Sequence, residues 1–306
     1  REGSVVGDPV AASVSGAMTS LAKAPTYAHS GKATPRGLVF GFASLVVAPF
    51  LGALYAVGIF TIPFIYLNAI LTLGFGGWLG VGIASALRSG EVRSAVLSLA
   101  FVAVGTALAY YVHWAVWLNR LSEGELALIE ALRPDVMLDF IGGVYDVGAW
   151  SLAGNDVSGM ALGAVWAVEL ALIFGASLLA GFTIATGDVY CESCGRWCDK
   201  HDDVLALDGT ADPGALQSRL AAGDLAVLGE LPRVTQGDPT WFQINLQRCH
   251  GCGQTNTLNL DRVTLTADDK GKEQRKEDRL LEGLLLTPEQ ADWVTRVGGG
   301  DPSYAG

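Results

Sequence analysis

The chain has 306 residues, of which half are apolar and only 17% are charged, and its formal net charge is −11. This length accommodates two domains. No Asp, Glu, Lys or Arg occurs in residues 38–87, whereas residues 188–306 contain 12 Lys and Arg and 20 Asp and Glu, a net charge of −8. We therefore expect a lipid-embedded first part and a water-soluble second part. The acidic second part argues against nucleic acid as a partner, because phosphate binding needs concentrated positive charge.

The N-terminal residues 1–36 are rich in Ala, Ser, Gly, Thr and Val and show no apolar period. This composition predicts a flexible tail, with a weak helix around residues 11–23. The tail also lacks the apolar core of a signal peptide.

Four apolar stretches follow, together with a domain boundary at residue 187. Residues 38–87 are too long for one span, because about 20 residues cross a bilayer. Pro63 suits the first turn of a new helix, so we expect a break before it. The predicted spans of the 37–187 domain are 38–60, 63–87, 94–118 and 160–187.

The segment 119–159 lies between the third and fourth predicted spans. Ser122-Glu123-Gly124-Glu125 has the pattern of a capping box that opens a helix. An apolar stripe then follows Pro134, from Val136 to Tyr145. The segment is therefore either two short amphipathic helices on the membrane surface or an ordinary folded loop.

Basic residues predict the orientation of the spans, since Lys and Arg are enriched in cytoplasmic loops. Five of them fall on one side of the predicted bundle: Lys23, Lys32, Arg36, Arg88 and Arg93. Arg120 and Arg133 fall on the other side, which makes 119–159 extracytoplasmic. The N-terminus and, after four spans, residues 188–306 are then cytoplasmic, where a reducing environment keeps thiols free for metal.

Two Cys-x-x-Cys pairs, Cys191/Cys194 and Cys249/Cys252, predict a zinc site in the soluble part. Four protein ligands leave no open coordination position, so such a zinc ion is structural. Cys198, His201 and His250 are alternative donors, which would replace a cysteine or form a weaker second site. A redox role for the two pairs is the other alternative.

The flanking sequence predicts a small α+β domain over residues 188–306. Residues 241–246 and 255–266 alternate like two strands on either side of the second cysteine pair, which is the hairpin of a zinc ribbon. Helices are expected to start at Asp212-Pro213 and at Thr287-Pro288, with a charged, solvated segment at 270–279.

Three polar residues interrupt the predicted spans at comparable depth in their outer halves: Asn68, His113 and Glu169. They form either a site for an ion, a proton or a small ligand, or hydrogen bonds that fix the bundle. The glycines of Gly76-x-x-x-Gly80 predict close helix packing, because a dinucleotide-binding loop would follow a soluble strand.

The stretches 63–68, 71–76 and Cys191-Glu192-Ser193-Cys194-x-x-Trp197-Cys198 resemble a family of uncharacterised bacterial four-span membrane proteins with a C-terminal cytoplasmic zinc ribbon. The resemblance covers about residues 38–260. It implies a multi-pass protein of the bacterial inner membrane and carries no known activity.

The expected function is non-enzymatic, because no catalytic constellation is visible. A membrane-anchored zinc ribbon would act as a scaffold that recruits a protein partner or assembles copies of itself, with Trp197 and Trp241 either in contact with the partner or in the core. The alternative is a small transporter or channel component that uses Asn68, His113 and Glu169.

Overall fold

The computed structural model describes residues 24–62, 65–148, 150–152, 155–235, 237–267 and 272–299. The chain forms two compact units. Of the described residues, the membrane unit contains those within Tyr27–Asp199 and Gln247–Thr255, and the sheet unit contains 24–26 and those within Lys200–Leu246 and 256–299. The four long helices and both cysteine turns therefore belong to the same unit.

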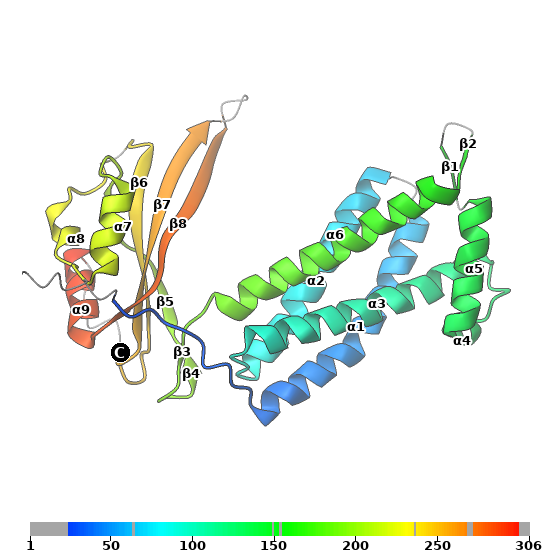
Figure 1. The fold of residues 1–306 in the computed structure, drawn as a ribbon, viewed down its shortest axis with the longest axis horizontal. Coiled ribbons are helices and arrows are strands. Elements are labelled where there is room, and N and C mark those ends of the chain that lie inside the picture. The colour runs from blue at the N-terminus through cyan, green and yellow to red at the C-terminus, as the bar shows by residue number, and fades with distance from the viewer. Residues whose placement is uncertain are drawn as a thin grey trace, which may run out of the picture. The chain divides into compact units, whose positions relative to one another are not determined.

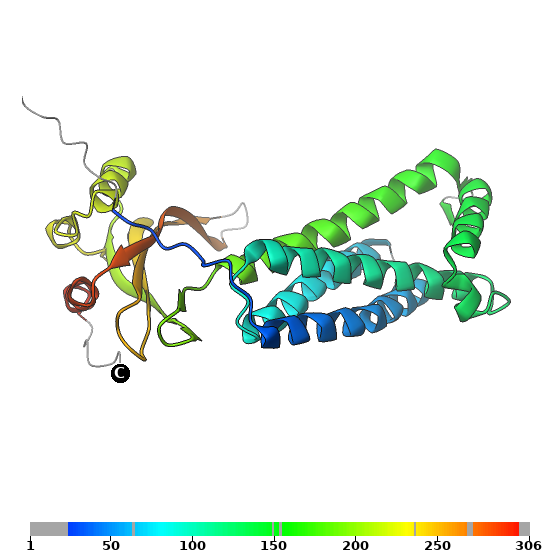
Figure 2. The ribbon, with the colours of Figure 1, turned by 60° about the horizontal axis from the view of Figure 1, so that its bottom comes forward.

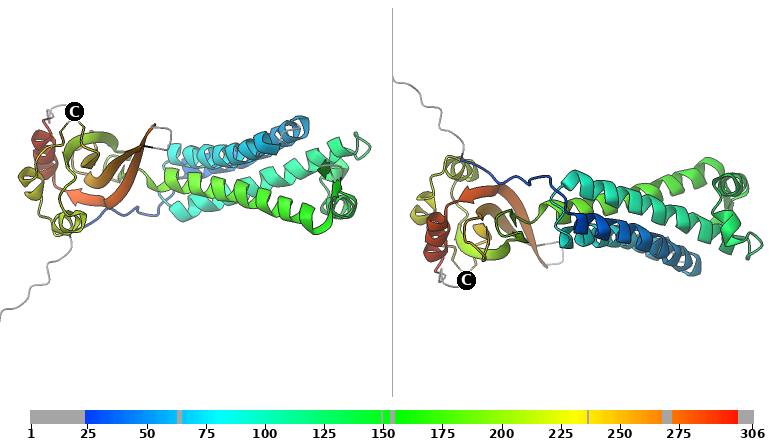
Figure 3. Two further views of the ribbon diagram at one scale, coloured as in Figure 1. Left: turned by 90° about the horizontal axis from the view of Figure 1, so that it is seen from above. Right: turned by 90° about the horizontal axis from the view of Figure 1, so that it is seen from below.

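Four helices of the membrane unit are long and apolar enough to cross a membrane. They are α1 (Pro35–Thr61), α2 (Ile65–Ser89), α3 (Ala95–Leu121) and α6 (Gly159–Thr186), and they run alongside one another (Figures 1 and 3). Side-chain caps explain two of the starts, since the hydroxyls of Thr34 and Ser94 accept hydrogen bonds from the first turns of α1 and α3. The predicted four-helix bundle is confirmed, whereas Pro63 lies outside the described residues.

Glycines allow the closest helix contacts in the bundle. A Cβ at Gly52 of α1 would collide with the Ala109 carbonyl of α3. On α2, a Cβ at Gly76 or Gly80 would collide with a backbone carbonyl of α6, at Ile173 or Ser177. The backbones can approach this closely only without a side chain, so Gly76-x-x-x-Gly80 is a helix-packing face.

The segment between α3 and α6 forms the short helix α4 (Leu128–Ala131), α5 (Pro134–Val147) and a hairpin of β1 (Trp150–Leu152) and β2 (Asn155–Val157). The predicted capping box is wrong, because Ser122 ends α3 and the backbone turns at Glu123 and Gly124 with positive φ. Helix α5 crosses the ends of α3 and α6 (Figure 2). Its Met137 packs with Trp114 and Leu118 of α3.

The sheet unit has four strands in the order β5 (Asp199–Asp208), β6 (Thr240–Arg248), β7 (Asn256–Ala267) and β8 (Glu273–Leu286). Strands β7 and β8 pair antiparallel. Helices α7 (Pro213–Ala221), α8 (Val227–Glu230) and α9 (Pro288–Val297) cover one face (Figure 1). That face carries the core, which includes Leu216, Leu220, Phe242, Ile244, Leu246 and Val294.

The second and third strands and helices α7 and α9 occur where the sequence predicts them, and α9 opens with the Thr287–Gln290 capping box. The charged segment 270–279 differs from its prediction. Residues 273–279 are exposed, as expected, but they form the first half of β8 and pair with β7. Charges on both faces of the strand hide the two-residue period.

We predict that Gly80→Val destabilises the membrane unit by about 1–3 kcal/mol, because the added side chain would force α2 away from α6. Gly77→Val is the matched control on the same helix, since nothing lies within 4 Å of a Cβ at Gly77. Thermal unfolding of both variants in detergent checks the difference. Equal melting temperatures would show that the close α2–α6 contact does not stabilise the bundle.

Candidate metal centre

Two tight turns of the same build carry the four cysteines. The first lies between β3 (Tyr190–Cys191) and β4 (Arg196–Trp197), and the second follows β6. In each turn a glycine stands four residues after the first cysteine. Gly195 and Gly253 have φ values of 63° and 64°, and their N–H groups donate to the carbonyls of Cys191 and Cys249. A left-handed glycine lets each loop close tightly enough to point two thiols the same way.

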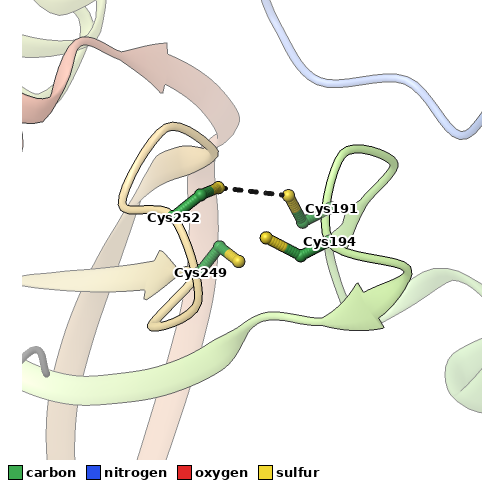
Figure 4. Close-up of side chains that lie close together, drawn as sticks. All are labelled: Cys191, Cys194, Cys249 and Cys252. Carbon is green, nitrogen blue, oxygen red and sulfur yellow. Dashed lines mark hydrogen bonds between the residues drawn. The ribbon is translucent and has the colours of Figure 1, made fainter.

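The four sulfur atoms converge between the two turns (Figure 4). The Sγ atoms of Cys191, Cys194, Cys249 and Cys252 all lie within 4.8 Å of one another, and those of Cys191 and Cys252 are 3.6 Å apart. A tetrahedral ion with metal–sulfur bonds of about 2.3 Å would hold its sulfurs about 3.8 Å apart. The arrangement therefore fits a tetrahedral ion with four sulfur ligands.

The surroundings favour a thiolate at Cys191. Burial raises the pKa of this thiol, but hydrogen bonds from Thr255, from the Cys194 backbone and from neighbouring thiols outweigh burial and bring the pKa to about 6. The pKa values of two partners move the other way: the Cys252 thiol, with burial, raises the pKa of Cys194 to about 12, and burial raises the pKa of Cys249. The metal-free group therefore favours one thiolate, and a metal ion, which binds thiolates, would have to displace the remaining thiol protons.

The alternative donors stay outside this group. Burial and the nearby Cys249 and Cys191 thiols raise the pKa of Cys198 to about 12, so it remains a neutral thiol in the small core beside the site. His250 is engaged by Asp199 and by Arg196, whose guanidinium nitrogen lies 2.6 Å from Nε2. His201, on β5, is also not among the described residues that cluster as possible metal ligands.

Ion pairs, a hydrogen bond and a cation–π contact connect the first cysteine turn to the end of α2 and to the turn that leads into α3. Arg88 forms an ion pair with Asp188 at 2.5 Å, and its carbonyl accepts a hydrogen bond of 3.0 Å from the indole of Trp197. Arg93 stacks over Tyr190, 4.5 Å from the ring centroid, and pairs with Glu192 at 3.1 Å. The sequence shows Arg88 and Arg93 only as markers of topology, and no local pattern links them to residues about 100 positions later.

Part of the predicted N-terminal tail also belongs to this site. The hydroxyl of Tyr27 accepts a hydrogen bond of 3.0 Å from the Tyr190 backbone, and Ser30 donates to Glu192 at 2.5 Å. The carbonyl of Lys32 accepts a hydrogen bond from the Arg93 backbone. These contacts hold residues 27–32 in place, whereas residues 1–23 lie outside the described part of the chain.

The second set of predicted polar residues is only partly brought together. His113 Nε2 lies 4.0 Å from Glu169 Oε1, and the hydroxyl of Tyr55, which the sequence analysis missed, forms a hydrogen bond of 2.6 Å with the same oxygen. Asn68 contributes its backbone carbonyl, which accepts a hydrogen bond from Thr72. Its side-chain Oδ1 is buried and has no hydrogen-bond partner among the described residues.

Comparisons with protein-family models, with curated proteins and with solved structures find no match to this chain. What agrees with the resemblance suggested by the sequence is the architecture: four long apolar helices followed by a β-containing region with a four-cysteine cluster.

We predict that Cys252→Ser abolishes stoichiometric metal binding, because it removes one of the four converging sulfurs. Cys198→Ser is the control, since it alters a cysteine of the same small core that stands outside the group of four. Metal per chain, measured by elemental mass spectrometry on purified protein, distinguishes the two. Equal metal content in both variants would contradict this ligand set.

Proposed function

We propose that this protein is a membrane-anchored zinc ribbon that acts as a scaffold, recruiting a protein partner or assembling copies of itself. The observation that carries the proposal is the convergence of four cysteine sulfurs within 4.8 Å of one another. Tetrahedral sites with four thiolates favour zinc or iron–sulfur centres, and two Cys-x-x-Cys turns are the usual zinc-ribbon arrangement. A zinc ion held by four protein ligands has no open position, so we assign it a structural role and the protein no enzymatic one.

Zinc would hold the two cysteine turns together inside the membrane unit, to which both turns belong. Strand β6 runs from the sheet unit directly into the second cysteine turn, and Cys191 follows the end of α6 by five residues. One ion would therefore tie the segment that leaves the last long helix to the hairpin that leads into β7. The contacts of Arg88 and Arg93 with the first turn support an anchoring role, because they fix the ribbon to the bundle.

The basic residues support a cytoplasmic ribbon in a bacterial inner membrane. Arg88 and Arg93 contact residues of the first cysteine turn and the segment just before it, so the positive residues and the cysteines lie at the same end of the bundle. By the rule that Lys and Arg mark the cytoplasmic side, this end faces the cytoplasm. The reducing cytoplasm would keep the four thiols available for zinc.

A protein partner or a second copy suits the acidic soluble part better than nucleic acid does. Trp197, which the sequence offers as a contact residue, is half-buried against Arg88 and Tyr190. Trp241 is also half-buried, with Arg275 stacked over it. Partner binding in this proposal therefore does not depend on either tryptophan.

One observation favours a second candidate, a small transporter or channel component. Glu169 meets side chains from other long helices inside the bundle, with Tyr55 at 2.6 Å and His113 at 4.0 Å. Ion flux into liposomes that is lost in Glu169→Gln, but kept in the cysteine variants, would select this candidate over the scaffold.

The scaffold is tested by comparing wild type, Cys249→Ser/Cys252→Ser and Cys198→Ser after crosslinking in cells. We expect the double variant to lose zinc together with a specific crosslinked partner or the self-crosslinked form, while Cys198→Ser keeps both. Quantitative mass spectrometry of the crosslinked species provides the measurement. A partner that stays bound to a zinc-free double variant would contradict the proposal.

A further inference from the structure

A layer of polar side chains crosses the membrane unit, and all four long helices contribute to it. Tyr55 comes from α1, Thr72 from α2, His113 from α3 and Glu169 from α6. Each lies six to ten residues from the end of its helix that is remote from the cysteines. At a rise of 1.5 Å per residue this is about 9–15 Å along the helix axis. The side chains therefore meet well inside the apolar part of the bundle.

The carboxyl group of Glu169 lacks a fixed positive partner in this layer. Among the described residues, the titratable groups that face it are Tyr55 on α1 and Tyr110 and His113 on α3. His113 is 2% exposed, and its Nδ1 has no hydrogen-bond partner among the described residues. An imidazolium here would bury a charged N–H without an acceptor, which is costly. His113 is therefore poorly placed to remain a counter-ion for a Glu169 carboxylate.

The hydrogen bonds in this layer need one more hydrogen than its hydroxyl groups supply. Three oxygen–oxygen contacts run in series: Glu169 to Tyr55 at 2.6 Å, Tyr55 to Thr72 at 2.8 Å, and Thr72 to the Asn68 carbonyl at 2.8 Å. Each is of hydrogen-bond length and needs one hydrogen. The two hydroxyl groups supply two hydrogens, and the carbonyl supplies none.

Whether this hydrogen is present depends on whether Glu169 is a carboxylate or a carboxylic acid. With a carboxylate, Tyr55 donates to Glu169, and Thr72 can then donate to Tyr55 or to the Asn68 carbonyl but not to both. One pair of oxygens is left facing each other at 2.8 Å without a hydrogen. With a carboxylic acid, Glu169 donates to Tyr55, Tyr55 to Thr72, and Thr72 to the carbonyl, so every contact is satisfied.

We propose that Glu169 binds one proton from the surrounding water inside the membrane unit, and that this proton completes the hydrogen-bond chain through Tyr55 and Thr72 to α2. The protonated layer then links α6, α1 and α2 by neutral hydrogen bonds, which suits an apolar environment. This proton site goes beyond the zinc scaffold, and it needs neither the metal nor a partner.

The test is infrared spectroscopy of the full-length protein in lipid nanodiscs near neutral pH, where exposed carboxyl groups are ionised. We expect wild type to show the C=O band of one protonated carboxylic acid and Glu169→Gln to lose it. Glu130→Gln is the control, because Glu130 is an exposed carboxyl group outside the long helices. Tyr55→Phe provides a second variant that keeps the carboxyl group, and its band should shift toward that of a free acid.

Three results would overturn the proposal. One is the absence of an acid band in wild-type protein near neutral pH. Another is a band that persists in Glu169→Gln. The third is loss of the band when sodium chloride replaces choline chloride at constant pH, which would show that the site takes up a sodium ion in place of the proton.

Discussion

The convergence of four cysteine sulfurs is the constraint on which this account depends. Few apolar side chains surround them: Val189, Cys198 and Tyr27 pack beside the four ligands. Such a small core buries too little surface to hold two turns together by packing alone. A metal ion that replaces the thiol protons would supply the missing stabilisation, because the free energy of metal binding adds directly to the stability of the folded turns. The separate contacts of Arg88 and Arg93 connect the first cysteine turn to the helix bundle.

The bundle itself is stabilised in two different ways along its length. At the level of Gly52, Gly76 and Gly80 the helices touch backbone to backbone, which maximises van der Waals contact where lipid provides no hydrophobic driving force. One to two helical turns away, the polar layer around Glu169 links α1, α2 and α6 by hydrogen bonds.

Much of this architecture could be predicted from the sequence, because its signals are local. Long, mostly apolar stretches indicated the four long helices, and paired cysteines indicated the group of four. The helix start predicted at Thr287-Pro288 is confirmed by α9, which the structure shows to open with a capping box. The helix start predicted at Ser122 is wrong, because Glu123 and Gly124 have positive φ and turn the chain there.

What the sequence could not show are pairings between distant positions. Trp197 and Arg88 are separated by more than 100 residues, and nothing in the sequence around either residue predicts contact with the other. Tyr55 and Thr72 looked like ordinary span residues until the fold placed them in a chain with Glu169. Strand β8 was hidden for a different reason, since its charged first half is exposed and its partner strand supplies the register.

X-ray absorption spectroscopy at the zinc edge of the purified, full-length protein tests the central claim most directly. The account predicts one zinc ion per chain with four sulfur neighbours at about 2.3 Å and no lighter ligand. Nitrogen or oxygen in the first coordination shell would contradict the four-cysteine site. Protein purified without zinc would contradict the claim that a zinc ion holds the two cysteine turns together.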